Sequence, residues 1–165
     1  MTASLPPIVL EQPKDAPLVD ALIDRAFGPG RYAKAAERLR EGNRRLTQMC
    51  FVAHADGVVV GCVRMWPIRI GETPAVLLGP LAVEDAWRSF GLGAALVGRA
   101  CEAAAAAGHS LVLLVGDEPY YGPLGFTAAP RAVVLPGPVD PARVLVHELE
   151  PGLAASLSGS VRADP

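Results

Sequence analysis

A glycine-containing loop is the first place in this sequence where residue types and spacing suggest chemistry. It reads Arg88-Ser89-Phe90-Gly91-Leu92-Gly93, after an apolar run and before an alanine-rich segment. Free backbone N–H groups and the dipole at a helix start attract anions, and glycines let a phosphate approach the backbone. The GxGxxG spacing and the GK[ST] ending are both absent. The loop alone therefore fits either an anion site or a simple tight turn.

A second motif, Tyr120-Tyr121-Gly122-Pro123-Leu124-Gly125-Phe126, lies beyond the next apolar run and fits Y-x-x-x-G-F. The first loop fits R/Q-x-x-G-x-G/A, and the run before it reads LGPLAV. With both motifs in this order, the sequence resembles the GNAT superfamily of acetyl-CoA-dependent N-acetyltransferases, in particular a bacterial subgroup of predicted acetyltransferases. The resemblance spans roughly residues 8–150 and includes Ala26-Phe27-Gly28-Pro29-Gly30-Arg31.

The resemblance implies a cosubstrate, acetyl-CoA, and a role for each matching residue. The pyrophosphate would lie on the loop. The pantetheine arm would pair with the preceding strand, which in this family bulges near Gly79-Pro80 and splays from its neighbour. Tyr121 matches the tyrosine assigned as general acid to the departing CoA thiolate, whereas Phe126 matches a packing position. The implied cofactor-binding residues are Leu81, Ala82, Val83, Arg88, Ser89, Phe90, Gly91, Leu92, Gly93 and Ala94.

The implied reaction is direct attack of a primary amine on the thioester carbonyl. It needs a neutral amine, a polarised carbonyl and help for the leaving sulfur. Residues 76–83 include no carboxylate, so the base that some family members carry on this strand is missing. Asp117, Glu118 or water is left for that role, although the pattern favours a turn aspartate and a helix-start glutamate before Pro119 over a catalytic pair. An acyl-CoA-binding or sensing protein without turnover is therefore the alternative function.

The acceptor amine is a small molecule or a peptide whose identity the sequence does not reveal. An antibiotic, a polyamine, an amino acid and a protein amine all remain open. A basic stretch fits an acidic substrate, the 3′-phosphate of CoA or a solvated helix face. Its members are Arg31, Lys34, Arg38, Arg40, Arg44 and Arg45.

Hydropathy and turn signals predict the elements that hold these motifs. A strand at 8–10 and two helices, from Asp15 to before Gly28 and over 31–40, precede three antiparallel strands at 50–54, 58–70 and 75–83. A helix ending at Ala107 and a buried strand at 111–115 complete a β-α-β unit, and strands near 132–135 and 143–149 follow. We therefore predict an α/β (α+β) fold of GNAT type. It has a mixed, mainly antiparallel sheet of six or seven strands, about four flanking helices and the β-α-β unit around the CoA site. The domain spans residues 5–150 and is followed by a flexible tail over 151–165.

Composition limits the remaining possibilities. With 165 residues, 51% hydrophobic and 19% charged, the chain suits one folded domain. Its net charge of −2 argues against a nucleic-acid partner, and no apolar run is long enough for a bilayer. No signal peptide is visible, so a cytoplasmic location is expected. The three cysteines show no metal-ligand spacing, so no metal is predicted. A homodimer and a preference for a longer acyl-CoA both remain open.

Overall fold

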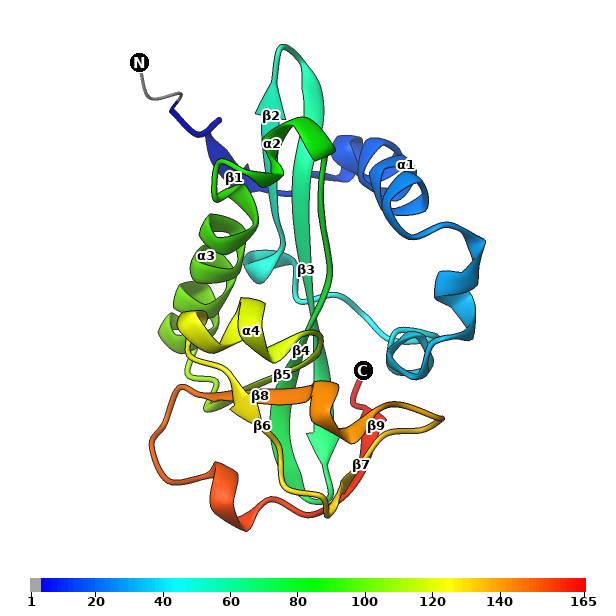
Figure 1. Ribbon diagram of the computed structural model, residues 1–165, viewed down its shortest axis with the longest axis vertical. Helices are drawn as coiled ribbons and strands as arrows, with labels where there is room; N and C mark the ends of the chain where they lie inside the picture. Colours follow the sequence, from blue (N-terminus) through cyan, green and yellow to red (C-terminus); the bar gives the residue numbers. More distant parts are fainter. Residues whose placement is uncertain (1–3) are drawn as a thin grey trace.

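The computed structural model describes residues 4–165, in which nine strands form one mixed sheet with helices on both faces (Figure 1). The main path runs β1-β2-β3-β4-β5-β8-β6, and β9 connects β3 to β7. Along this path only β4 and β5 are parallel. The strands are β1 (Ile8–Leu10), β2 (Phe51–Ala55), β3 (Val58–Ile70), β4 (Thr73–Val83), β5 (Leu111–Val115), β6 (Thr127–Ala128), β7 (Val133–Val134), β8 (Val144–Glu148) and β9 (Gly159–Ala163).

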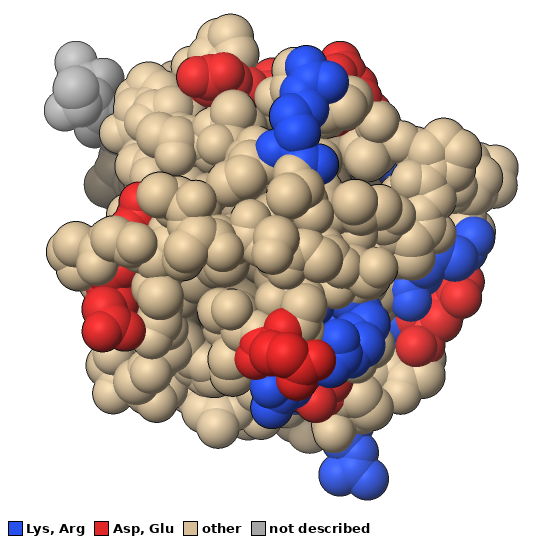
Figure 2. Space-filling model, turned by 90° about the horizontal axis from the view of Figure 1, so that it is seen from below, with Lys and Arg blue, Asp and Glu red and all other residues tan. Residues whose placement is uncertain are grey.

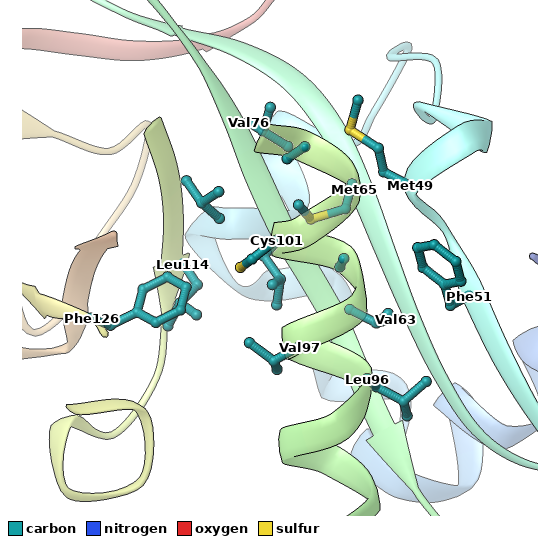
Figure 3. Close-up of a cluster of buried hydrophobic side chains, with 14 of the residues drawn as sticks. Met49, Phe51, Val63, Met65, Val76, Leu96, Val97, Cys101, Leu114 and Phe126 are labelled. Carbon is teal, nitrogen blue, oxygen red and sulfur yellow. The ribbon is translucent and has the colours of Figure 1, made fainter. Parts of the chain in front are cut away.

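The two faces of the sheet carry separate cores, because successive side chains of a strand point to opposite sides. On one face, α3 (Leu92–Ala106) packs on a cluster that includes Leu96 and Phe51 (Figure 3). On the other face, α1 (Ala16–Phe27) covers a cluster that includes Val52. Two one-turn helices, α2 (Asp85–Arg88) and α4 (Glu118–Tyr121), flank α3 and β5 along the chain. The predicted mixed, mainly antiparallel sheet with one β-α-β unit is confirmed, with nine strands instead of six or seven.

The helix predicted over 31–40 is wrong. Two 3₁₀ segments, η2 (Pro29–Ala33) and η3 (Ala35–Leu39), occupy this stretch, and Lys34 between them is extended at φ −73° and ψ 146°. The segment buries Ala35, Glu37 and Leu39 but nothing in η2. So short an apolar face cannot support a regular helix, most of whose stability comes from packing.

The flexible tail predicted over 151–165 is also wrong. Within it, β9 pairs antiparallel with β3, placing Val161 opposite Ile70, and parallel with β7. Val161 is buried in a cluster with Ile68 and Ile70. An Ala-, Gly- and Ser-rich segment shows little hydropathy signal, but Leu157 and Val161 both bury their side chains in this cluster and dock it.

None of the helices in residues 4–165 combines the length and the apolar character that spanning a bilayer requires.

Candidate functional site

A cleft of about 530 Å³ opens where β4 and β5 separate. Their parallel pairing is limited to Val76 with Val112 and Leu77 with Leu113. Residues 78–83 of β4 and residues 115–117 after β5 form two of its walls. Within residues 4–165, no strand pairs with the β5 side of β4 beyond Leu77. The predicted separation is thus confirmed, and the backbone edge faces the cleft.

A bulge changes the direction of β4 where it separates from β5. Val63 of β3 lies opposite Leu81, but Met65 lies opposite Leu78, so Gly79 and Pro80 together face one residue of β3. The Trp66 indole Nε1–H donates a hydrogen bond of 2.6 Å to the carbonyl of Gly79. The bulge expected at Gly79-Pro80 is present, and a side chain of the neighbouring strand holds it in position.

The glycine loop begins α3 at one end of the cleft. Gly91 is the N-cap residue in the left-handed region at φ 80°, and the space around its α-carbon is open. The first N–H groups of α3 have no acceptor within the helix, as at every helix start. Of the predicted cofactor residues, five line the cleft: Leu81, Ala82, Val83, Arg88 and Gly93. The others, Ser89, Phe90, Gly91, Leu92 and Ala94, lie in the loop or first helical turn outside the cleft wall, and the Leu92 side chain is buried in the core.

Tyr121, at the end of α4, also lines the cleft. Its ring lies against Gly116, where only glycine fits, and meets the buried Phe126 edge-on at 5.9 Å between centroids. Burial raises the pKa of Tyr121 to about 12; the neighbouring Tyr120 and Asp117 add to this, and Arg143 opposes it. The phenol is therefore fully protonated near neutral pH and is available as a proton donor.

Tyr120 is also on the cleft wall, although its position does not match the motif. Its ring stands edge-on to Tyr121 at 4.8 Å, and its hydroxyl lies against Gly93 at the start of α3. Burial raises the pKa of Tyr120. The tyrosine pair thus bridges the end of β5 and the glycine loop.

The two candidate carboxylates separate in the structure. Asp117 lines the cleft and accepts from Arg143, with 3.2 Å between Nε and Oδ1. Glu118 is exposed and lies outside the cleft wall. In the described part of the chain, no three His, Cys, Asp or Glu side chains are grouped to hold a metal.

Side chains from α1, η2 and η3 form the remaining wall. Phe27, Arg31, Lys34 and Arg40 all face the cleft. Arg31 is held by Asp24 at 3.0 Å and by the Tyr32 hydroxyl, to which its Nη2 donates at 2.6 Å. The three basic residues belong to the stretch that sequence patterning could not distinguish from a solvated helix face.

Comparison with known proteins shows which family has this arrangement. The protein-family model described as the acetyltransferase (GNAT) domain matches residues 47–128. The uncharacterised N-acetyltransferase YhbS of Escherichia coli strain K12 is 35% identical over 124 residues, which are 74% of each chain. The chain belongs to the GNAT family of N-acetyltransferases.

Solved GNAT structures share this fold. The crystal structure of Escherichia coli YhbS in complex with CoA superimposes with a TM-score of 0.81 at 29% identity, covering 99% of this chain and 93% of that one. A GNAT acetyltransferase from Brucella melitensis in complex with acetyl-CoA gives 0.72 at 25% identity, over 96% and 95% of the two chains.

Tyr120 and Arg40 line the cleft but were not among the predicted site residues, although Arg40 belongs to the basic stretch considered for an acidic substrate. Tyr120 lies beside the motif tyrosine, and only its doubling in the sequence was a signal. Arg40 is one of six basic residues within 31–45, and nothing in their spacing separates those on the cleft wall from Arg38, which pairs with Glu41 away from it.

Proposed function

We propose that the chain transfers the acetyl group of acetyl-CoA to a primary amine by direct attack on the thioester. One observation carries this proposal: the unpaired edge of β4, the start of α3 and Tyr121 meet in a single cleft. The solved relatives with CoA or acetyl-CoA support the choice of cosubstrate. The acceptor is a small-molecule or peptide amine.

The proposed binding mode uses backbone groups. The pantetheine amides would pair with the free edge of β4, as an added strand does. The pyrophosphate would accept from N–H groups at the start of α3. The pairing with the pantetheine amides involves Leu81, Ala82 and Val83. The pyrophosphate site consists of Arg88, Ser89, Phe90, Gly91, Leu92, Gly93 and Ala94.

In the proposed reaction, the amine nitrogen attacks the carbonyl carbon and a backbone N–H of β4 polarises the oxygen. The C–S bond then breaks, and Tyr121 gives its phenolic proton to the departing sulfur. The thiol pKa is about 8.5 in water, so proton transfer from this phenol, of pKa about 12, to a fully hydrated thiolate would be uphill by about 5 kcal/mol. Burial also raises thiol pKa values in this protein, to about 12 for Cys62 and about 11 for Cys50. A thiolate that is equally desolvated in the cleft therefore accepts the proton with little penalty.

The amine must also lose a proton. Asp117 is the carboxylate on the cleft wall, and we propose that it takes this proton directly or through water.

Two measurements test the proposal. Acetyl-CoA should raise the Tm, because a ligand that binds only the native state stabilises by about 2.7 kcal/mol at a hundredfold excess over Kd. A panel of amines should then release free CoA thiol, with the acetylated amine identified by mass spectrometry. No rise in Tm would overturn the proposal. A rise without turnover of any amine would favour the binding or sensing alternative.

The three buried free thiols fit a reducing compartment and support the expected cytoplasmic location.

A further inference from the structure

The charges around the cleft are unbalanced. On the face shown in Figure 2, basic side chains lie mostly beside acidic ones. The cleft has two lining carboxylates, Asp117, which is paired with Arg143, and Asp140, which accepts from the Ala142 N–H. The cationic side chains on its wall are Arg31, Lys34, Arg40, Arg88 and Arg143. Cations therefore outnumber anions here, although the chain as a whole has a net charge of −2.

Three of these cations belong to η2, η3 and the residues around them, on the face of the sheet away from α3 (Figure 1). Ala35 and Leu39 of η3 pack with Leu77, whereas the core under α3 contains its neighbours Val76 and Leu78. The glycine loop and the basic segment thus reach the cleft from opposite faces. A cosubstrate lying on the loop leaves the basic segment to the acceptor.

Arg40 has a hydrogen-bonding capacity that the fold does not use. Its side chain is 15% exposed, and its Nη1 donates to Glu37 Oε2 at 3.0 Å. Its buried Nε–H has no partner among residues 4–165. Burying such a donor without a partner is costly, so the position of this side chain at the cleft is an unusual feature. Arg31, in contrast, is held by Asp24 and Tyr32.

The free side of Arg40 faces the position where the reaction would occur. A β-carbon on Gly79 would lie 2.8 Å from Arg40 Nη2, so the guanidinium lies directly over the bulge of β4. Glu37 occupies Nη1, which leaves Nη2 as the donor over the bulge, because Nε is covered by the surrounding residues. A cationic donor in this position suits a carboxylate oxygen.

We propose that the amine acceptor carries a carboxylate near its amino group and that Arg40 binds this carboxylate through Nη2. The inference rests on the proposed acetyl transfer and names its substrate class. The proposal disfavours polyamines and other polycationic acceptors, because the positive charges of Arg31, Lys34 and Arg40 on the cleft wall would repel them. A guanidinium close to the incoming amine also favours the neutral form that attacks, which helps a site without a carboxylate on β4.

The test compares acids with their amides. The twenty proteinogenic amino acids, their carboxamides and spermidine are offered at saturating acetyl-CoA, and release of CoA thiol is followed. We expect at least one acid to exceed its amide by about 10- to 100-fold in kcat/KM, the usual range for a hydrogen bond between charged groups. Equal use of acid and amide, or preferred use of spermidine, would overturn the proposal.

The R40Q variant assigns the effect to this side chain. We expect R40Q to lose about 10- to 100-fold in kcat/KM for the acid, with little change for the amide or in acetyl-CoA affinity. R38Q, two residues earlier in η3 but outside the cleft wall, is the matched control and should behave as wild type. Equal losses for acid and amide in R40Q would indicate a merely structural role. Weakened acetyl-CoA binding would instead assign Arg40 to a CoA phosphate.

R40Q leaves Glu37 buried without its partner, so the double variant E37Q/R40Q provides a form without an unpaired buried charge. Binding gives a second readout that does not depend on turnover: thermal shifts of the CoA-saturated protein with the same acids and amides. At least one acid should raise the Tm in wild type but not in E37Q/R40Q. If no acid does so, the carboxylate site is wrong, whereas a failure of acetyl-CoA itself to raise the Tm would show that the proposed function is wrong.

Discussion

The two sides of the cleft are built in different ways. The side formed by β4, α3, β5 and α4 presents backbone edges, a helix start and two tyrosines, all within the residues that the GNAT domain model matches, 47–128. The side formed by α1, η2 and η3 lies outside that range and presents charged side chains on short 3₁₀ turns. Backbone N–H groups can bind a ligand at the first side because glycines stand at fixed positions in the sequence, and this spacing is a recognisable motif. Charged side chains line the second side only where the 3₁₀ turns direct them into the cleft, and no sequence motif indicates which ones these are.

If the side formed by β4, α3, β5 and α4 binds acetyl-CoA through its backbone, a large side chain in the glycine loop should weaken acetyl-CoA binding more than any other change. Gly91→Glu places a long acidic side chain in open space where the pyrophosphate would lie. We expect this variant to show no rise in Tm with acetyl-CoA. In the wild type, bound acetyl-CoA should stabilise the native state by about 2.7 kcal/mol at a hundredfold excess over Kd. Gly91→Ala is the control, because it carries the same backbone penalty at φ 80° without bulk or charge. Equal losses of binding in both variants would show that backbone strain, not blocked access, is responsible.

A smaller effect on kcat is expected from Tyr121→Phe, at or below about 10²-fold, the low end for general-acid catalysis, because a thiolate already leaves readily. Acetyl-CoA affinity should change little, since the ring and its contact with Phe126 remain. Tyr120→Phe should reduce kcat less. Its hydroxyl lies against Gly93, so any change should be in KM for acetyl-CoA. A greater kcat loss in the Tyr120 variant would reverse the two roles.

The pH profile sharpens the role of Tyr121. With a pKa raised to about 12 by burial, the phenol keeps its proton well above the ordinary value of about 10. The rate with a good acceptor should therefore show no decline from loss of this acid between about pH 8 and 10.5. A decline centred near pH 10 that disappears in Tyr121→Phe would contradict the raised pKa.

Asp117→Asn should cost about tenfold in kcat at neutral pH, below the general-base range because water can also take the proton. The loss should shrink as pH rises, since more of the amine is already neutral. Glu118→Gln is the matched control and should leave the rate unchanged, because Glu118 is off the cleft wall. A pH-independent loss in Asp117→Asn would point instead to its pairing with Arg143.

The smallest effect on activity is expected where neither side of the cleft is touched. Val161→Ala, in β9, removes buried methyl groups and should destabilise the fold by about 2 kcal/mol. For a chain of this size the Tm should fall by about 4–8 °C. At 25 °C kcat and both KM values should match wild type, and a change in either would show that β9 helps to position the cleft.

The sequence predicted the elements on the side of the cleft formed by β4, α3 and β5, because local signals determine them. The GxG loop and the apolar strand at 111–115 each carry their own signal. The sequence did not predict the break at Lys34, because helical and 3₁₀ segments share the same hydropathy pattern. Arg40 could not be separated from Arg38, since the difference arises only when η3 packs over the bulge at Gly79.

The docking of β9 has a consequence for how the chain is made. Arg69 and Asp164, which pair at the end of β3, are 95 positions apart. A ribosome must therefore translate most of the protein before the far end of β3 meets its second neighbour, and contacts of such long range form slowly. Until then Ile68 and Ile70 lack the cover of Val161. A nascent or truncated chain that stops short of β9 should expose this apolar strip and be prone to aggregation and to capture by chaperones.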